Sequence, residues 1–329
     1  MMASVHESYL VNGICDKKQS FIKGRTGNEG TNIVWVADRC VMTDALFILK
    51  DFDESTYLKL NPDVSAAVDN RSFASGLEHC LTYGIYEDRP GLPQAIKEHM
   101  NSRGHEFEPP PGNLRARVHG DESLQDFTNV GKLLSYNLFS SFLSLTEIES
   151  GNRVIDFGCG CGRVINYLSM LFSNNHFHGC DIDPEAIAWC QANLSHVGEF
   201  KINDALPPLP FDNDYFDFVY SISVFTHLPE EMQTVWLEEL KRVTRKGGYL
   251  LITTHGEVLA PEQIRPALRD HGFYYSVSTG TDGLPDFYQT SFHTEEYIRR
   301  HWADYFEIVR IIKKGILNHQ DLVICRNSP

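Results

Sequence analysis

The stretch VIDFGCGCGRVINYL, residues 154–168, constrains the fold of this chain more than any other. An apolar run ends in Asp156, glycines follow at alternate positions as Gly158, Gly160 and Gly162, and a helical pattern comes next. Glycines directly after a strand let the backbone approach a ligand, and the start of the following helix favours negative charge. We therefore expect a strand, a ligand-binding loop and a helix, in this order.

Strands and helices alternate after residue 152, which is typical of a Rossmann-like, doubly wound α/β sheet. We predict strands at residues 153–157, 176–182, 199–203, 217–223, 248–255, 306–312 and 321–326. We predict helices near residues 163–172, 184–195, 230–244, 261–270 and 294–303. The segment between the last two strands contains Gly315 and Asn318, and no helix fits into it. The sheet should therefore end in an antiparallel hairpin.

The chain before the sheet divides into three predicted parts. Residues 1–50 have no assigned role, although TNIVWVADRCVMTDALFIL could supply one or two strands. Residues 51–92 predict a small helical module, in which Asn61 and Pro62 start one helix and Gly84 closes another. Residues 93–121 predict a linker, because three consecutive prolines favour an extended chain.

The domain that contains the predicted sheet spans residues 122–329. It begins with a helix in LQDFTNVGKLLSYNLFSSFLSL, ahead of the glycine loop. Residues 255–303 are long for a connection between a strand and a helix, and their pattern predicts a hairpin with a glycine-rich turn, then a helix capped by Thr294. We interpret this insertion as a lid over a substrate.

Charge and cysteine content exclude some classes of protein. The chain of 329 residues has 29 basic and 44 acidic residues, for a net charge of −15, which opposes a large nucleic-acid footprint. Its eight cysteines lack the rhythm of a disulfide scaffold, and Cys159 and Cys161 have no second pair to complete a zinc site. The longest apolar runs are short, and MMASVHESYL does not resemble a signal peptide, so we expect a cytoplasmic protein.

Two ligands are considered for the glycine loop. The dinucleotide fingerprint G-x-G-x-x-G needs its third glycine at residue 163, which is Arg163, and this departure disfavours NAD. S-adenosylmethionine has a zwitterionic tail instead of a pyrophosphate, and Asp156 can serve its ammonium group. Asp181 stands 19 residues after Gly162, where a ribose acceptor is expected, and Ile182 can cover one face of the adenine.

Further residues at predicted strand ends extend this site. Asp183 and Pro184 are interpreted as the cap and first residue of a helix. Asp204 could accept from the adenine amino group, with Ala205 supplying backbone contacts. Ser221 and Ile222 end the fourth strand, beside the loop, where ligands bind in doubly wound sheets.

The segments VIDFGCGCGRV, GCDIDPEAI, NDALPPLPFDNDYFDFVYSISVFTHL and LKRVTRKGGYLLITTHG follow one another at suitable spacing. In this order they resemble the class I S-adenosylmethionine-dependent methyltransferases, over about residues 125–329. The resemblance implies a seven-stranded sheet with an antiparallel last strand. It also implies that Asp156, Gly158 and Gly160 line the methionyl site, that Asp181 binds the ribose and that Asp204 binds the adenine. Phe127 and Gly131 lie on the preceding helix, which commonly covers the cofactor in this family.

The helical module has a resemblance of its own. Residues 57–91, YLKLNPDVSAAVDNRSFASGLEHCLTYGIYEDRPG, resemble a segment that lies beside glycosyltransferase or methyltransferase domains in bacterial surface-polysaccharide pathways. This implies a packing or interaction module rather than a catalytic one.

A hydroxyl acceptor needs a base, and His227 in SVFTHLP is the candidate, because a histidine titrates near neutral pH. Tyr288 and His293, from the insertion, are expected substrate contacts. The leading prediction is O-methylation of a small molecule or sugar, with S-adenosylmethionine as cofactor and no metal. N-methylation of a natural product, an NAD-dependent oxidoreductase or epimerase, and a non-catalytic cofactor-binding protein remain alternatives.

Overall fold

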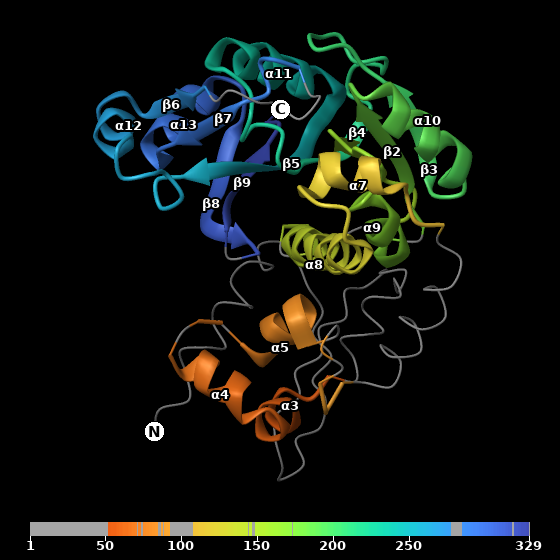
Figure 1. Cartoon of the computed structure of the whole chain (residues 1–329), viewed down its shortest axis with the longest axis vertical. Helices are drawn as coiled ribbons and strands as arrows, with labels where there is room; N and C mark the ends of the chain where they lie inside the picture. The colour runs from red at the N-terminus through yellow and green to blue at the C-terminus, as the bar shows by residue number, and fades with distance from the viewer. Residues whose placement is uncertain are drawn as a thin grey trace. The chain divides into compact units, whose positions relative to one another are not determined.

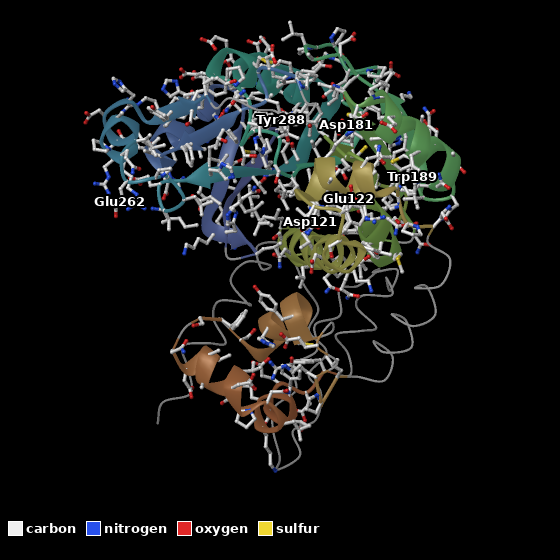
Figure 2. The ribbon with its side chains drawn as sticks, viewed as in Figure 1. Asp121, Glu122, Asp181, Trp189, Glu262 and Tyr288 are labelled. Atoms are coloured by element: carbon white, nitrogen blue, oxygen red, sulfur yellow. The ribbon has the colours of Figure 1, made fainter. Side chains whose placement is uncertain are left out.

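A computed structural model describes residues 52–92 and 108–328, except residues 71, 74, 85–86, 88, 144, 147–148, 173, 278–284 and 318. Figure 1 shows the fold, and Figure 2 adds the side chains. The strands predicted within residues 1–50 and the tip of the predicted lid, Gly280–Gly283, lie outside the described residues.

The chain forms two compact units. The first consists of residues 1–108, 135–150 and 170–174, and the second consists of residues 109–134, 151–169 and 175–329. The second unit therefore begins at residue 109, inside the predicted linker, and residues 112–119 of that linker form a helix, α7 (Gly112–His119). The last of the three prolines, Pro111, directly precedes this helix, and Gly120, with a φ of 89°, ends it. The prolines that suggested a linker therefore mark the start of a helix.

The first unit contains the helices predicted for the module. They are α3 (Glu54–Leu60), α4 (Pro62–Asp69), α5 (Gly76–His79) and the π-helical turn η1 (Cys80–Gly84). Tyr57 is fully buried, and its hydroxyl is hydrogen-bonded to Nδ1 of His79 at 3.1 Å.

Asn61 precedes Pro62 at the start of α4, as predicted, but its side chain does not cap the helix. Its Nδ2 instead donates to the carbonyls of Tyr57 and Pro90, at 2.8 and 2.9 Å. The Asn61 amide therefore links the end of α3 to the segment that contains Pro90.

The second unit is built on a sheet of nine strands among the described residues, and seven of them form its main part. These are β1 (Arg153–Phe157), β2 (His176–Asp181), β3 (Gly198–Ile202), β4 (Phe216–Ser221), β5 (Thr244–Gly256), β8 (Glu307–Ile316) and β9 (Gln320–Arg326). Their order is β3-β2-β1-β4-β5-β9-β8, with β9 antiparallel to both neighbours and the first five strands parallel. The predicted fold class and the terminal hairpin are confirmed. The largest differences are that β5 begins four residues early, at Thr244, and that β8 continues to Ile316.

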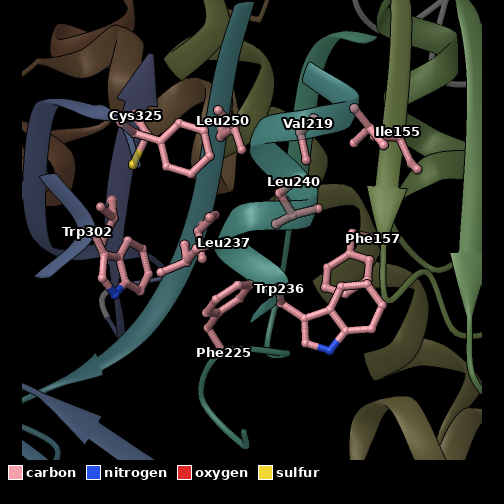
Figure 3. Close-up of a cluster of buried hydrophobic side chains, with 14 of the residues drawn as sticks. Ile155, Phe157, Val219, Phe225, Trp236, Leu237, Leu240, Leu250, Trp302 and Cys325 are labelled. Carbon is pink, nitrogen blue, oxygen red and sulfur yellow. The ribbon is translucent and has the colours of Figure 1, made fainter. Parts of the chain in front are cut away.

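The remaining helices are α8 (Leu124–Leu143), α9 (Ile165–Leu171), α10 (Pro184–Asn193), α11 (Glu230–Val243), α12 (Arg265–His271), α13 (Glu295–His301) and the 3-10 turn η2 (Trp302–Asp304). Helix α11 buries one face, and Trp236, Leu237 and Leu240 contact the apolar side chains of the sheet (Figure 3). Its partners there include Ile155 and Val219. Each such side chain contributes about 1.5–3 kcal/mol when it is removed from water.

The insertion contains the predicted hairpin. Strands β6 (Phe273–Ser276) and β7 (Thr290–His293) pair antiparallel, and β7 also pairs with the last two residues of β5, His255 and Gly256. The insertion is therefore hydrogen-bonded to the carboxyl end of a central strand, next to the edge of the sheet where ligands bind in this fold.

Thr294 caps α13, as predicted, since its hydroxyl accepts from the backbone N–H of Tyr297 at 3.1 Å. We expect Thr294→Ala to lower the free energy of unfolding by about 1 kcal/mol, because one backbone donor loses its partner. Chemical denaturation measures this change. Thr294→Ser keeps the hydroxyl and should retain most of the stability; equal destabilisation by both variants would contradict the capping role.

Candidate cofactor-binding and catalytic site

The glycine loop lies where the order of the strands reverses. The chain runs from β1 outward to β3 and then returns to β4, on the other side of β1. Gly158 has a φ of 83°, and a Cβ atom there would lie 2.2 Å from Cγ2 of Val224, in the loop after β4. Only glycine allows these two loops to approach so closely. The carboxyl ends of β1 and β4 therefore form the two walls of one crevice, the usual ligand site of such sheets.

Asp181, at the end of β2, holds this loop. Its Oδ2 accepts from the N–H of Gly160 at 2.7 Å, and its Oδ1 accepts from the N–H of Asp183 at 2.9 Å. Burial raises the pKa of Asp181, and the backbone hydrogen bonds oppose that rise. The structure thus brings Asp181 and Gly160 together, as expected for a site that binds the ribose beside the loop.

The next helix begins at the residues that the sequence predicted. Asp183 is the cap of α10, accepting from the N–H groups of Glu185 and Ala186 at 3.0 and 3.3 Å, and Pro184 is its first residue. Arg117 of α7 pairs with Asp183 at 2.8 Å and with Glu185 at 2.7 Å. Helix α7 is therefore attached to the start of α10, an attachment for which the sequence held no local signal.

Asp156 lies beneath the loop, near the end of β1. It is only 2% exposed, and burial raises its pKa to about 8, while the neighbouring Tyr220 hydroxyl and the positive charge of Arg163 act in the opposite direction. A carboxyl group in such surroundings gains from a cationic ligand, because a positive charge favours its ionised form. The role of Asp156 toward an ammonium group stays a prediction.

The predicted adenine contacts differ in availability. The side chain of Asp204 is exposed beyond β3, and Ile182 is half-buried. The carbonyl of Ala205 already accepts from Nε1 of Trp236 at 3.2 Å, so that carbonyl is engaged within the protein. The Ser221 hydroxyl is buried without a hydrogen-bond partner, and Ile222 is buried beside it.

Phe127 and Gly131 lie on α8, as predicted, but both are in packed positions. Phe127 is fully buried. A Cβ atom at Gly131 would lie 2.5 Å from the carbonyl oxygen of Arg163 and 3.1 Å from the Tyr167 ring. Gly131 therefore allows α8 to approach the segment after the glycine loop, and the described contacts give it a packing role.

His227 follows β4 and has a defined environment. Its Nδ1 lies 2.5 Å from the carbonyl oxygen of Gln289, and its ring stacks on Tyr288 at 4.2 Å between centroids. Tyr288 donates to the carbonyl of Ser223 at 2.9 Å. Burial raises the pKa of Tyr288; the negative charge of Asp181 raises it further, and the positive charge of Arg163 lowers it. We therefore assign Tyr288 and Asp181, both labelled in Figure 2, to one site. His227 adjoins this site through its stacking on Tyr288.

His293 does not fit its predicted role as a substrate contact. It is 1% exposed, and its Nε2 is hydrogen-bonded to Oε1 of Gln233 at 2.8 Å. Its ring also lies near those of Phe273 and Trp302. His293 is the last residue of β7, and its side chain is buried against Gln233 of α11. It therefore attaches the insertion to α11 and is not accessible to an acceptor.

Arg163 is a residue of this site that the sequence analysis considered only as an obstacle to NAD. Its guanidinium group is buried, and Nη1 lies 3.3 Å from Nδ1 of His119, at the end of α7. The sequence does indicate Arg163, because a charged residue directly follows the last glycine of the loop and precedes an apolar stretch. His119 carried no such signal, since its position depends on how α7 packs.

The described residues suit the predicted cofactor. A glycine cradle without side chains, a carboxylate at the ribose position, a buried acid and a buried cation match the ribose, ammonium and carboxylate groups of S-adenosylmethionine. His119, Asp121 and Asp126 lie close enough together to hold a metal ion, but both acids are exposed and nothing else at that group indicates an ion. Within the described part of the chain, no helix is both long and apolar enough to cross a membrane.

Comparison with known proteins shows what this domain is similar to. Residues 155–252, from β1 to β5, match the family described as "Methyltransferase domain". This part of the chain includes the glycine loop and the strands on both sides of it, so the match falls on the candidate site.

Individual relatives resemble parts of the chain. A fatty-acid O-methyltransferase of Mycolicibacterium smegmatis is 35% identical over 120 residues, covering 36% of this chain and 42% of that protein. A tRNA (carboxymethyluridine(34)-5-O)-methyltransferase of Arabidopsis thaliana is 34% identical over 110 residues, covering 33% and 25%. The chain thus spans less than half the length of these relatives. A solved S-adenosylmethionine-dependent methyltransferase from Methanosarcina mazei is 21% identical, with a TM-score of 0.43, covering 55% of this chain and 94% of that one.

Proposed function

We propose that this protein transfers the methyl group of S-adenosylmethionine to a hydroxyl oxygen of a small molecule, including sugars. The observation that carries the choice of oxygen is the environment of His227. A carbonyl oxygen can only accept a hydrogen bond, so the contact with Gln289 places the proton on Nδ1. Nε2 of the neutral ring then has a free lone pair, and within the described residues it forms no hydrogen bond.

The protonation state of His227 suits a base. Burial lowers its pKa from the ordinary value of 6.5, and the hydrogen bond to Gln289 opposes this shift. The ring is therefore neutral at pH 7 and able to accept a proton. A base that titrates slightly below the working pH is effective in general base catalysis.

The mechanism follows from these positions. The bound cofactor supplies a methyl group that its sulfonium already makes electrophilic. Asp181 and the glycine loop would hold the cofactor, which would give up its methyl group by breaking the methyl–sulfur bond and leave as S-adenosylhomocysteine. Nε2 of His227 would take the proton of the acceptor hydroxyl. Tyr288, stacked on His227, fixes the plane of the ring at a 4.2 Å centroid distance and closes one side of the acceptor site. Orientation of this kind supplies a large part of the acceleration.

The class of acceptor is supported by charge and by the relatives. A net charge of −15 disfavours an acceptor with many phosphates, such as tRNA. Both relatives named above are O-methyltransferases, which supports oxygen as the atom that is methylated. A fatty acid offers a carboxylate oxygen, so the choice of a hydroxyl rests on His227 and not on these relatives. The module at residues 57–91 adds sugars to the acceptors worth testing, through its resemblance to segments of polysaccharide pathways.

Transfer of label from methyl-labelled S-adenosylmethionine to a panel of acceptors tests the proposal. The panel contains long-chain alcohols, sugars and nucleotide sugars, fatty acids, amines and bulk tRNA. Label in a base-stable ether of an alcohol or sugar is the expected result. Label in an amine, in tRNA or in a base-labile ester would contradict it, since a carboxylate needs no base. S-adenosylhomocysteine binding without any turnover would favour the non-catalytic alternative.

The pH dependence of the reaction provides a second test. We expect kcat/KM for a hydroxyl acceptor to rise with pH through an apparent pKa below 6.5 and to be level by pH 7.5, because protonation of His227 removes the base. Initial rates between pH 5 and 8.5 measure this. A profile that is still rising above pH 7.5 would show that another group, or hydroxide, takes the proton.

A further inference from the structure

Arg163 is a buried cation to which no residue in the described part of the chain offers an anionic partner. It is 8% exposed and is the first residue after the glycine loop. Its Nε has no hydrogen-bond partner, and among the described residues its one hydrogen-bond contact is between Nη1 and Nδ1 of His119. No carboxylate of the described residues lies within ion-pair distance of it.

Such an arrangement is costly in a folded protein. A buried charge without a partner loses its hydration and gains little in return, a penalty of several kcal/mol. Burial lowers the pKa of Arg163 to about 10, so the group still carries its charge at neutral pH. Buried arginines are normally satisfied by carboxylate or phosphate groups, which their planar fork matches with two parallel hydrogen bonds.

The surroundings of Arg163 define what the partner must be. The charge of Asp156 acts on Arg163, so the two groups lie in the same part of the site without forming an ion pair. Tyr288 also interacts with Arg163 from the other side of the crevice. A ligand that gives both groups a partner needs an anionic group toward Arg163 and a cationic group that favours the ionised form of Asp156, and a free α-amino acid end has both.

We propose that Arg163 binds the carboxylate of the amino-acid end of the cofactor and thereby makes the site selective for ligands that carry this group. The inference rests on the proposed function, because it assigns a residue to the methionyl end of the same site. Asp156 takes the ammonium group, which favours its ionised form, and Arg163 takes the carboxylate, so both buried groups gain a partner of opposite charge when the ligand binds.

A purely structural role predicts something different. In that case Arg163 would hold α7 through His119, and its loss would weaken every ligand equally, because the whole crevice would loosen. A pyrophosphate site would likewise use a cation here, but it has no use for a buried acid at Asp156, since that acid would repel the phosphates.

Isothermal titration with two ligands separates these possibilities. The ligands are S-adenosylhomocysteine and its decarboxylated analogue, which keeps the ammonium group and lacks only the carboxylate. The natural protein should bind S-adenosylhomocysteine about 10- to 50-fold more tightly than the analogue. In Arg163→Met this ratio should fall to near one, through loss of affinity for S-adenosylhomocysteine alone, and Arg163→Lys should restore part of it.

The control is His119→Gln, which removes the histidine ring that contacts Arg163 and keeps the cation; it should retain the preference. Equal weakening of both ligands in Arg163→Met would overturn the inference. Thermal unfolding shows whether Arg163→Met folds. If it does not, the natural protein and Arg163→Lys still decide. Equal affinity of the natural protein for the two ligands overturns the inference, and a preference that is partly lost in Arg163→Lys supports it. Binding of neither ligand by the natural protein would overturn the proposed function itself.

Discussion

His227→Gln is expected to lower kcat for hydroxyl methylation by about 10²- to 10⁴-fold, the range that general base catalysis contributes. The amide keeps a polar group of similar reach but cannot take a proton at neutral pH. Affinity for S-adenosylhomocysteine should stay within about twofold of the natural value. Among the described residues, the His227 side chain contacts Tyr288, His255 and the Gln289 carbonyl, and none of these is a predicted cofactor contact.

Steady-state kinetics with the acceptor found in the labelling panel measures the loss in kcat, and calorimetry measures the affinity. His196→Gln is the matched control, since it makes the same exchange at an exposed position. A loss in kcat of less than about fivefold in His227→Gln would remove His227 from the mechanism. A parallel loss of cofactor affinity would assign it to the architecture of the site instead.

Asp181→Ala should weaken S-adenosylhomocysteine binding by about 2–3 kcal/mol, or roughly a hundredfold. Two effects add: the ligand loses a charge-assisted acceptor, and the loop loses the carboxylate that accepts from the N–H groups of Gly160 and Asp183. Asp181→Asn keeps one acceptor oxygen for a backbone N–H, so it should bind more tightly than the alanine variant and less tightly than the natural protein.

Calorimetric titration of both variants measures these affinities, and Asp270→Asn, at an exposed position on α12, is the control for loss of one negative charge. Equal affinities of Asp181→Ala and the natural protein would show that another residue binds the ribose. Equal affinities of the alanine and asparagine variants would show that the charge matters and the loop contacts do not.

Local patterns predicted the elements of the second unit well. The alternation of strands and helices, the cap at Asp183 with Pro184 and the cap at Thr294 were all found where the sequence indicated. These features depend on neighbouring residues, because helix periodicity, capping and strand alternation act over a few positions. The prolines before α7 show the limit of such patterns, because a run of prolines is compatible both with a linker and with the segment just before a helix.

The contents of the site depended on contacts that no local pattern contains. His293 occurs in an insertion rich in aromatic residues, and only the pairing of β7 with β5 shows that it faces the core. The tautomer of His227 is set by Gln289, which is 62 residues away in the chain. Arg163 could be proposed as a ligand-binding residue only after the structure showed that it is buried and has no carboxylate partner among the described residues.

Residue type and spacing along the chain were enough to predict the order of the elements, the position of the glycine loop and the acids at or just after the ends of the first three strands. These features can be predicted because residue type and spacing set backbone conformation and burial locally. The contacts between side chains and loops were visible only in the folded structure: Tyr288 with His227, His119 with Arg163, Gly160 with Asp181. These contacts depend on how strands and helices pack, because packing brings together residues that the chain separates by 21 to 61 positions.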